Sequence, residues 1–243
     1  MRLFLSLPLP ATVAEHLDLA VGAVADAAAW GVGATDGRRG GAERGSESGS
    51  GRPAVRWTPR EQRHITLAFL GETPGGAVDE LTLELRRSLL RLPAPVVRLR
   101  GAGVFSGRTL WVGVQEQRGR AHGERGDRLT ALMAVCEEAG ALFASRGELL
   151  AARDRRRAHV TVGRARDRRR GEGILQHCAA ALSVYQGPEW TADEVLLVRS
   201  ELGAGRGGSA LHETLAEIPL SGAAGEARAT GETGGDGRGK SDG

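Results

Sequence analysis

The chain has 243 residues, enough for one large domain or two small ones, and its net charge at pH 7 is only +3. Lys240 is the single lysine; arginine suits bidentate phosphate contact, although a GC-rich genome gives the same composition. Two distant cysteines, Cys136 and Cys178, exclude a disulfide framework and a zinc knuckle and favour buried thiols in a reducing compartment.

The N-terminal part predicts a strand, a helix and an insertion. Residues 2–7 alternate weakly, as a strand does, and Thr12 with Glu15 forms a capping box for a helix that we expect to fade near Trp30. Residues 31–51 are rich in glycine, serine and charge and have no apolar periodicity. Such a segment cannot bury enough apolar surface to offset its ordering entropy, so we expect a disordered insertion.

The rest of the chain alternates between predicted helices and strands. Apolar periodicity predicts helices over residues 77–92, 129–143 and 174–184, and strands over residues 65–70, 96–101, 110–114, 160–164, 194–199 and 211–220. This order of elements indicates two related halves. Residues 221–243 are polar and glycine-rich, and we expect a disordered tail there.

No segment resembles a membrane span or a signal peptide. The apolar run at the N-terminus is broken by Pro8 and Pro10, and no stretch of ~20 apolar residues follows. We therefore expect a cytoplasmic monomer that does not engage a membrane.

Two short motifs carry the candidate chemistry. His64 and Thr66 lie in the sequence RHITLAFL, and His159 and Thr161 lie in AHVTVGR. Because side chains two positions apart in a strand share a face, each histidine should lie on the same face as its threonine, with the intervening apolar residues facing the core. The other histidines, which we expect to be structural or solvated, are His16, His122, His177 and His212.

Two histidines, one neutral and one protonated, can act as base and acid on one reacting centre. The hydroxyls of Thr66 and Thr161 can donate hydrogen bonds to phosphodiester oxygens, and Arg164 could add a charged contact. The sequence has no Walker A loop, no carboxylate cluster for two metals and no third histidine near either motif. These features favour acid–base chemistry without a metal or cofactor on a strained 2′,3′-cyclic phosphate.

Basic runs at residues 153–157 and 164–170 flank the second motif. Such runs can attract a polyanion, or they can be solvated loops of an arginine-biased chain.

The first motif, with Arg56, Trp57 and the following FLGE, resembles the first signature of the RNA 2′,3′-cyclic phosphodiesterases, or 2′-5′ RNA ligase-like proteins, of the 2H phosphoesterase superfamily. The segment HVTVGR beginning at His159 looks like the second signature, and residues 195–202 resemble the strand near the C-terminus of the family. The resemblance covers residues 1–30 and 52–220.

This resemblance implies an α+β, bilobal fold over residues 1–220. Two pseudo-symmetric halves, with antiparallel-rich sheets facing a central cleft and helices outside, would each supply one motif. The resemblance also implies hydrolysis of RNA 2′,3′-cyclic phosphate ends, or of small cyclic nucleotides, to a 2′-phosphate, with weak reverse 2′-5′ ligation. By this analogy His64 is the proton donor and His159 the proton acceptor.

Three departures from the family pattern concern the substrate lining. Ala158 stands where the family usually has proline, residues 155–157 are arginines where an aromatic residue is usual, and His212 aligns with a frequent tyrosine. Two alternatives therefore stay open. One is a binding module for RNA ends that has no activity, and the other is an enzyme acting on another cyclic phosphodiester, such as an ADP-ribose derivative.

Overall fold

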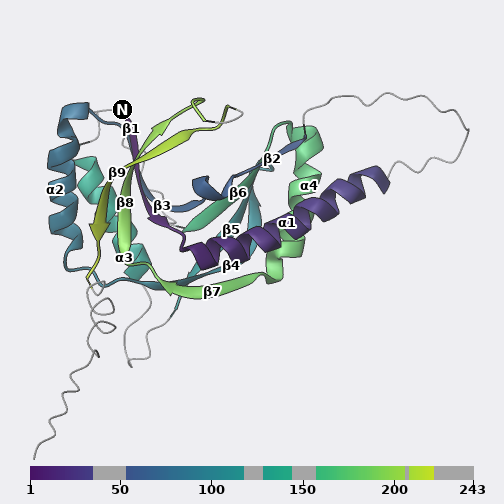
Figure 1. Ribbon diagram of the computed structural model, residues 1–243, viewed down its shortest axis with the longest axis horizontal. Helices are drawn as coiled ribbons and strands as arrows, with labels where there is room; N and C mark the ends of the chain where they lie inside the picture. Colours follow the sequence, from purple (N-terminus) through teal and green to yellow (C-terminus); the bar gives the residue numbers. More distant parts are fainter. Residues whose placement is uncertain (35–52, 118–127, 144–156, 206–207, 222–243) are drawn as a thin grey trace, which may run out of the picture.

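The structure is a computed structural model that describes residues 1–34, 53–117, 128–143, 157–205 and 208–221. These residues form one curved antiparallel sheet with helices packed outside it (Figure 1). None of the helices in the described part of the chain is long and apolar enough to cross a membrane.

The sheet follows the strand order β7-β4-β5-β6-β3-β1-β8-β9, and β2 pairs with β6 off this path. All of these strand pairs are antiparallel. The strands are β1 Arg2–Pro8, β2 Val55–Trp57, β3 His64–Glu72, β4 Val96–Phe105, β5 Thr109–Glu116, β6 His159–Ala165, β7 Gln186–Thr191, β8 Glu194–Glu201 and β9 Leu211–Pro219.

Two halves of the sheet meet at β3 and β6, the strands that carry the two motifs. These strands pair through one registered residue pair, Ile65 with Val160, whereas the neighbouring strands pair over longer stretches. The α+β fold with two antiparallel halves is therefore confirmed. The pairing of β3 with β6, which we call the junction, joins the two halves into one continuous sheet.

Helices cover the outer face of each half. The α-helices are α1 Ala11–Ala34, α2 Val78–Leu89, α3 Arg128–Ala141 and α4 Arg168–Ala181, and short 3-10 turns span Arg60–Gln62, Gly75–Ala77 and Leu182–Val184. Helix α3 packs on β3 and on α2, while α1 and α4 contact one another and lie on the strands of the other half (Figure 1). The start of α1 and the turn Arg60–Gln62 reach the inner face of the sheet, where they line a pocket together with His64.

Strand alternation builds the core. On β1, Leu3, Leu5 and Leu7 are at most 1% exposed and face the helices, because alternate side chains of a strand point to opposite faces. Cys136 and Cys178 are buried free thiols within the same core, as expected for small apolar side chains.

Several elements differ from the sequence prediction, and three of the differences have a clear local reason or consequence. Helix α1 continues to Ala34, four residues into the expected insertion. Helix α4 begins at Arg168, inside the second basic run, because the Asp167 side chain caps it by accepting a hydrogen bond from the Arg169 amide. Strand β7 was not predicted, since its polar sequence with Pro188 is typical of an edge strand rather than of a buried one.

The start of the predicted tail is ordered. The amide and hydroxyl of Ser221 both donate to the Leu92 carbonyl, which fixes the chain just after β9. Residues 222–243 and 35–52 lie outside the described residues, so the expected tail and most of the expected insertion stay predictions.

Candidate active site

Both motif strands present the predicted faces. On β3, Ile65 and Leu67 are at most 2% exposed in the core, while the side chains of His64 and Thr66 are partly exposed. On β6, Val160 is fully buried, and His159 and Thr161 are partly exposed in the same way. The apolar residues therefore anchor each motif, and the polar residues face away from the core.

The junction between the two halves brings the motifs together. Ile65 and Val160 lie directly opposite one another on antiparallel strands. Continuing that register by one residue on each side places His64 next to Thr161 and Thr66 next to His159. Each histidine thus has its own threonine two positions along the strand and the other threonine across it.

The local backbone fixes the orientation of both imidazoles. His64 Nδ1 lies 2.9 Å from the carbonyl oxygen of Gln62, and His159 Nδ1 lies 2.9 Å from that of Arg157. A carbonyl oxygen only accepts, so Nδ1 carries the proton in each case and Nε2 is the nitrogen left for chemistry. The same arrangement two residues before each histidine makes the two groups equivalent in geometry.

A β-bulge follows the threonine of each motif. The pairing of β1 with β3 skips Leu67, and the pairing of β5 with β6 skips Val162, so one extra residue stands in each motif strand. After the bulge, Phe69 pairs with Phe4 and Arg164 pairs with Thr109. Paired side chains share a face, so the bulges return Phe69 and Arg164 to the face of the histidines.

This shared geometry carries different chemistry on the two sides. Phe69 occupies the fifth position after His64 and is 59% exposed, whereas the fifth position after His159 is Arg164. The Arg164 guanidinium donates to Thr109 Oγ1 at 3.3 Å. The fifth residue after each histidine is therefore apolar in one motif and cationic in the other.

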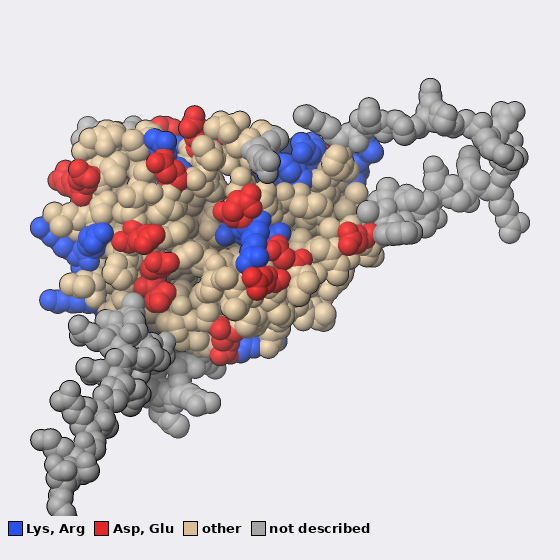
Figure 2. Space-filling model, viewed as in Figure 1, with Lys and Arg blue, Asp and Glu red and all other residues tan. Residues whose placement is uncertain are grey.

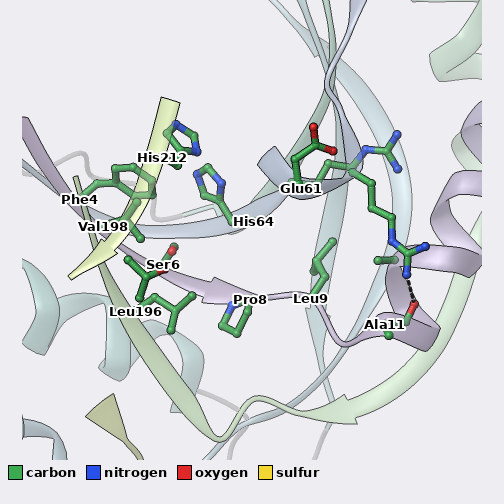
Figure 3. Close-up of a pocket in the computed structure, with 14 residues that line it drawn as sticks. Phe4, Ser6, Pro8, Leu9, Ala11, Glu61, His64, Leu196, Val198 and His212 are labelled. Atoms are coloured by element: carbon green, nitrogen blue, oxygen red, sulfur yellow. Dashed lines mark hydrogen bonds between the residues drawn. The ribbon is translucent and has the colours of Figure 1, made fainter. Parts of the chain in front are cut away.

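His64 lies in an aromatic and histidine-rich pocket of about 390 Å³. Its ring stacks on Phe4 at a centroid distance of 4.8 Å and meets His212 edge-on at 5.4 Å (Figure 3). Ser6, which is 1% exposed, lines the floor of this pocket (Figure 3). The structure places His212, for which we expect a structural or solvated role, beside His64.

Burial lowers the pKa of His64 from 6.5 to about 4. The nearby His212 and His159 lower this pKa further, and the hydrogen bond to the Gln62 carbonyl raises it. Burial also lowers the pKa of His212. At neutral pH the free protein therefore holds His64 as an uncharged imidazole with an unprotonated Nε2.

His159 lies beside an aromatic pair on the opposite half. The rings of Phe105 and Trp111 stack at 5.0 Å, and Phe105 meets His159 edge-on at 5.0 Å. Trp111 lies flat over Gly103, where a Cβ atom would come within 2.4 Å of the indole. The guanidinium of Arg157 lies 5.9 Å from the centre of the indole ring, within cation–π range.

The aromatic lining of this side therefore comes from β4 and β5 rather than from the residues before His159. Ala158 is buried, and its carbonyl accepts from the Val114 amide, so it serves the sheet. Arg155 and Arg156 lie outside the described residues. Sequence reasoning missed Phe105 and Trp111 because their proximity to His159 follows from strand pairing. The available signal was Trp111 within the predicted strand of residues 110–114; Phe105 lies outside both predicted strands, because β4 continues to Phe105.

Within the described ranges, no group of three or more His, Cys, Asp or Glu side chains is placed to hold a metal ion. The three histidines His64, His159 and His212 are divided between the two sides of the junction and face different neighbours. What the site offers is two imidazole Nε2 atoms, two threonine hydroxyls and one guanidinium around a single surface.

Comparison with known proteins adds the family and the fold. A family model described as the 2′-5′ RNA ligase superfamily matches residues 46–204. The crystal structure of TT0787 of Thermus thermophilus is 24% identical, with a TM-score of 0.52 over 90% of this chain and 98% of that one. The apo structure of E. coli LigT is 20% identical, with a TM-score of 0.53 over 90% of this chain and 96% of that one.

A third solved structure, described as a phosphoesterase, is 20% identical with a TM-score of 0.54 over 90% of this chain and 98% of that chain. No curated protein matched the sequence. The structural likenesses establish a shared fold, and the family model covers more than half of the chain, including both motifs. The chain therefore belongs to the 2′-5′ RNA ligase superfamily, whose members are 2H phosphoesterases.

Proposed function

We propose that this protein hydrolyses 2′,3′-cyclic phosphate ends of RNA, leaving a 2′-phosphate, by two-histidine acid–base catalysis without a metal ion. One observation carries the proposal. The two His-x-Thr motifs, distant in sequence, meet at the Ile65–Val160 junction with both Nδ1 atoms held by backbone carbonyls. In each ring Nε2 is then the nitrogen that can accept or give a proton.

In the proposed reaction His159 Nε2 takes a proton from water as the water oxygen attacks phosphorus. The bond from phosphorus to the 3′ oxygen breaks, and His64 Nε2–H gives that oxygen a proton, which yields a 3′-hydroxyl and a 2′-phosphate. Proton exchange with solvent then resets the two imidazoles. A 5′-hydroxyl that attacks phosphorus in place of water, giving its proton to His159 while the departing 3′ oxygen takes the proton of His64, would give weak 2′-5′ ligation.

The donor role of His64 depends on the bound substrate. A pKa of about 4 leaves this histidine neutral in the free protein at neutral pH. A phosphodiester carries a negative charge, and an opposite charge within a few ångströms favours the protonated imidazole. Substrate binding should therefore raise the pKa of His64. The alkaline limb of the kcat profile, where His64 loses the proton that it must donate, should then lie at higher pH than that of kcat/KM.

Thr66, Thr161 and Arg164 are proposed to hold the phosphoryl oxygens. The hydroxyls lie on the same face as the histidines, and the bulge after Thr161 returns Arg164 to that face. These donors would stabilise charge that redistributes over the non-bridging oxygens in the transition state. Solved structures of E. coli LigT with phosphate and with 3′-AMP show that a protein of this fold takes such groups.

The test is an RNA with a 2′,3′-cyclic phosphate end, incubated with the protein in EDTA, followed by identification of the product. We expect a 2′-phosphate, and each of His64→Asn and His159→Asn should lower kcat by ~10²–10⁴-fold. Asparagine keeps a donor for the carbonyl that each Nδ1 contacts. The matched control is His177→Asn, which changes an exposed histidine on α4.

A 3′-phosphate product, or full activity in either motif variant, would contradict the proposal. Turnover of another cyclic phosphodiester in preference to RNA ends would select a different substrate within the same chemistry. Tight binding of RNA ends with no turnover of any cyclic phosphate would indicate a binding module instead.

A further inference from the structure

A second pocket, of about 590 Å³, lies where β2, the end of β6 and the start of α4 meet. Arg56, Arg164, Arg166 and Arg170 line it, with Asp167 as its acidic member. We refer to it as the arginine pocket. Basic side chains gather on this part of the surface, over β2 and the adjacent end of α4 (Figure 2).

Among the described residues, little negative charge balances the arginine pocket. Arg56 and Arg164 lie directly opposite one another on β2 and β6, and like charges in that position destabilise a strand pair. Burial lowers the pKa of Arg164, and the nearby Arg56 lowers it further. An anion placed between the two guanidinium groups would relieve this repulsion.

The recorded partners of these arginines are neutral oxygens. Arg56 donates to the Gly208 carbonyl at 3.3 Å, and Arg164 donates to Thr109 Oγ1 at 3.3 Å. None of the ion pairs among described residues includes Arg56, Arg164, Arg166 or Arg170. The Asp167 carboxylate accepts from the Arg169 amide at the start of α4 and so acts as a helix cap.

The arginine pocket shares Arg164 with the proposed active site. Arg164 lines it and also lies on the face of His159 and Thr161, because the β6 bulge re-aims its side chain. An RNA whose terminal phosphate sits between the histidines carries further phosphates along its backbone. Those phosphates are the groups that arginine forks bind best.

We propose that the arginine pocket binds backbone phosphates of RNA next to the reacting end, so that the enzyme selects an oligonucleotide over a cyclic mononucleotide. This inference rests on the proposed function and deepens it by assigning a second phosphate subsite. Contacts between the arginines and the non-reacting phosphates should lower KM for the longer substrate. Such contacts stabilise the bound substrate and the transition state equally, so kcat should not change.

The test compares a 2′,3′-cyclic mononucleotide with a short oligonucleotide that ends in a 2′,3′-cyclic phosphate. The variant is Arg166→Gln with Arg170→Gln, since both residues are exposed and lie outside the acid–base machinery. The control is Arg87→Gln with Arg91→Gln, two exposed arginines at the end of α2 and just after it. Circular dichroism verifies that each variant folds.

We expect the wild type to have a lower KM for the oligonucleotide than for the mononucleotide. The pocket variant should raise KM for the oligonucleotide roughly tenfold or more, since contacts to charged groups are each worth a few kcal/mol at most. Its KM for the mononucleotide should stay the same, and the salt dependence of oligonucleotide KM should weaken. Equal effects on both substrates, no effect on either, or the same loss in the control pair would overturn the proposal.

A binding measurement separates this inference from the proposed reaction. Fluorescence anisotropy follows a labelled oligonucleotide that ends in a 2′-phosphate and does not react. If the wild type turns over neither substrate, the proposed function fails. The arginine pocket is still supported as a phosphate subsite when the Arg166→Gln, Arg170→Gln variant binds this oligonucleotide roughly tenfold more weakly and the control pair binds it normally. Equal binding by wild type and pocket variant would overturn the subsite whatever the activity.

Discussion

Protonation of His64 should destabilise the folded protein in acid. The pKa of this histidine is about 4 in the folded chain, against an ordinary value of 6.5. Between these pH values the unfolded chain binds a proton that the folded chain does not, so the free energy of unfolding falls as pH falls from 6.5 towards 4. Above pH 6.5 both states are neutral at this position, and the effect is absent.

The magnitude follows from the difference between the two pKa values. Each pH unit in that window is worth about 1.4 kcal/mol, so the loss reaches at most about 3 kcal/mol, and partial exposure of the ring reduces it. Against a typical domain stability of roughly 5–15 kcal/mol this is measurable. The neighbouring His212, whose pKa burial also lowers, acts in the same direction and adds to the total.

His64→Asn isolates this contribution because asparagine does not titrate and keeps a donor for the Gln62 carbonyl. Urea unfolding of the wild type and of the variant is measured at about pH 7.5 and at about pH 4, and the difference between them cancels carboxylate effects common to both. We expect wild type to lose more stability than the variant on acidification. The exposed His177→Asn variant serves as control and should track the wild type.

A wild type and His64→Asn variant that lose equal stability on acidification would refute the reasoning, because His64 would then have an ordinary pKa in the folded state. An NMR titration of the imidazole gives an independent check. An apparent pKa near 6.5 in the free protein would contradict the burial of this ring beside His212 and Phe4.

Three further predictions test the packing around the site. Gly103→Val should destabilise the protein by about 1–3 kcal/mol and shift its tryptophan fluorescence, because a Cβ atom at this position would lie 2.4 Å from the Trp111 indole. The control is Gly173→Ala on α4, where a Cβ atom meets open space, and this variant should be neutral or stabilising in thermal unfolding. Glu116→Ala should lower Tm through a loss of about 1 kcal/mol, because its two carboxylate oxygens accept from the first two amides of α3, and an unchanged Tm would contradict this capping role. Thr161→Val should lower kcat by roughly tenfold while leaving urea stability nearly unchanged, and an unaltered kcat would remove its hydroxyl from the proposed phosphate contacts.

Sequence reasoning predicted most helices and strands because their signals are local. Alternation on β3 and β6 indicated which side chains of each motif face the core, and burial of Ile65 and Val160 confirms it. It did not predict how α3 begins. The structure shows Glu116 of β5 accepting from the amides of Arg128 and Leu129 at the start of that helix.

The sequence by itself determined the two motifs, their faces and the family they indicate, because each depends on neighbours within a few positions of the chain. Only the tertiary structure decided what surrounds them. The single pairing of Ile65 with Val160, the bulges that turn Phe69 and Arg164 to the histidine face, and the approach of His212 to His64 all arise between strands distant in sequence. Register and burial between such strands are set by the packing of the whole sheet, and no local pattern specifies them.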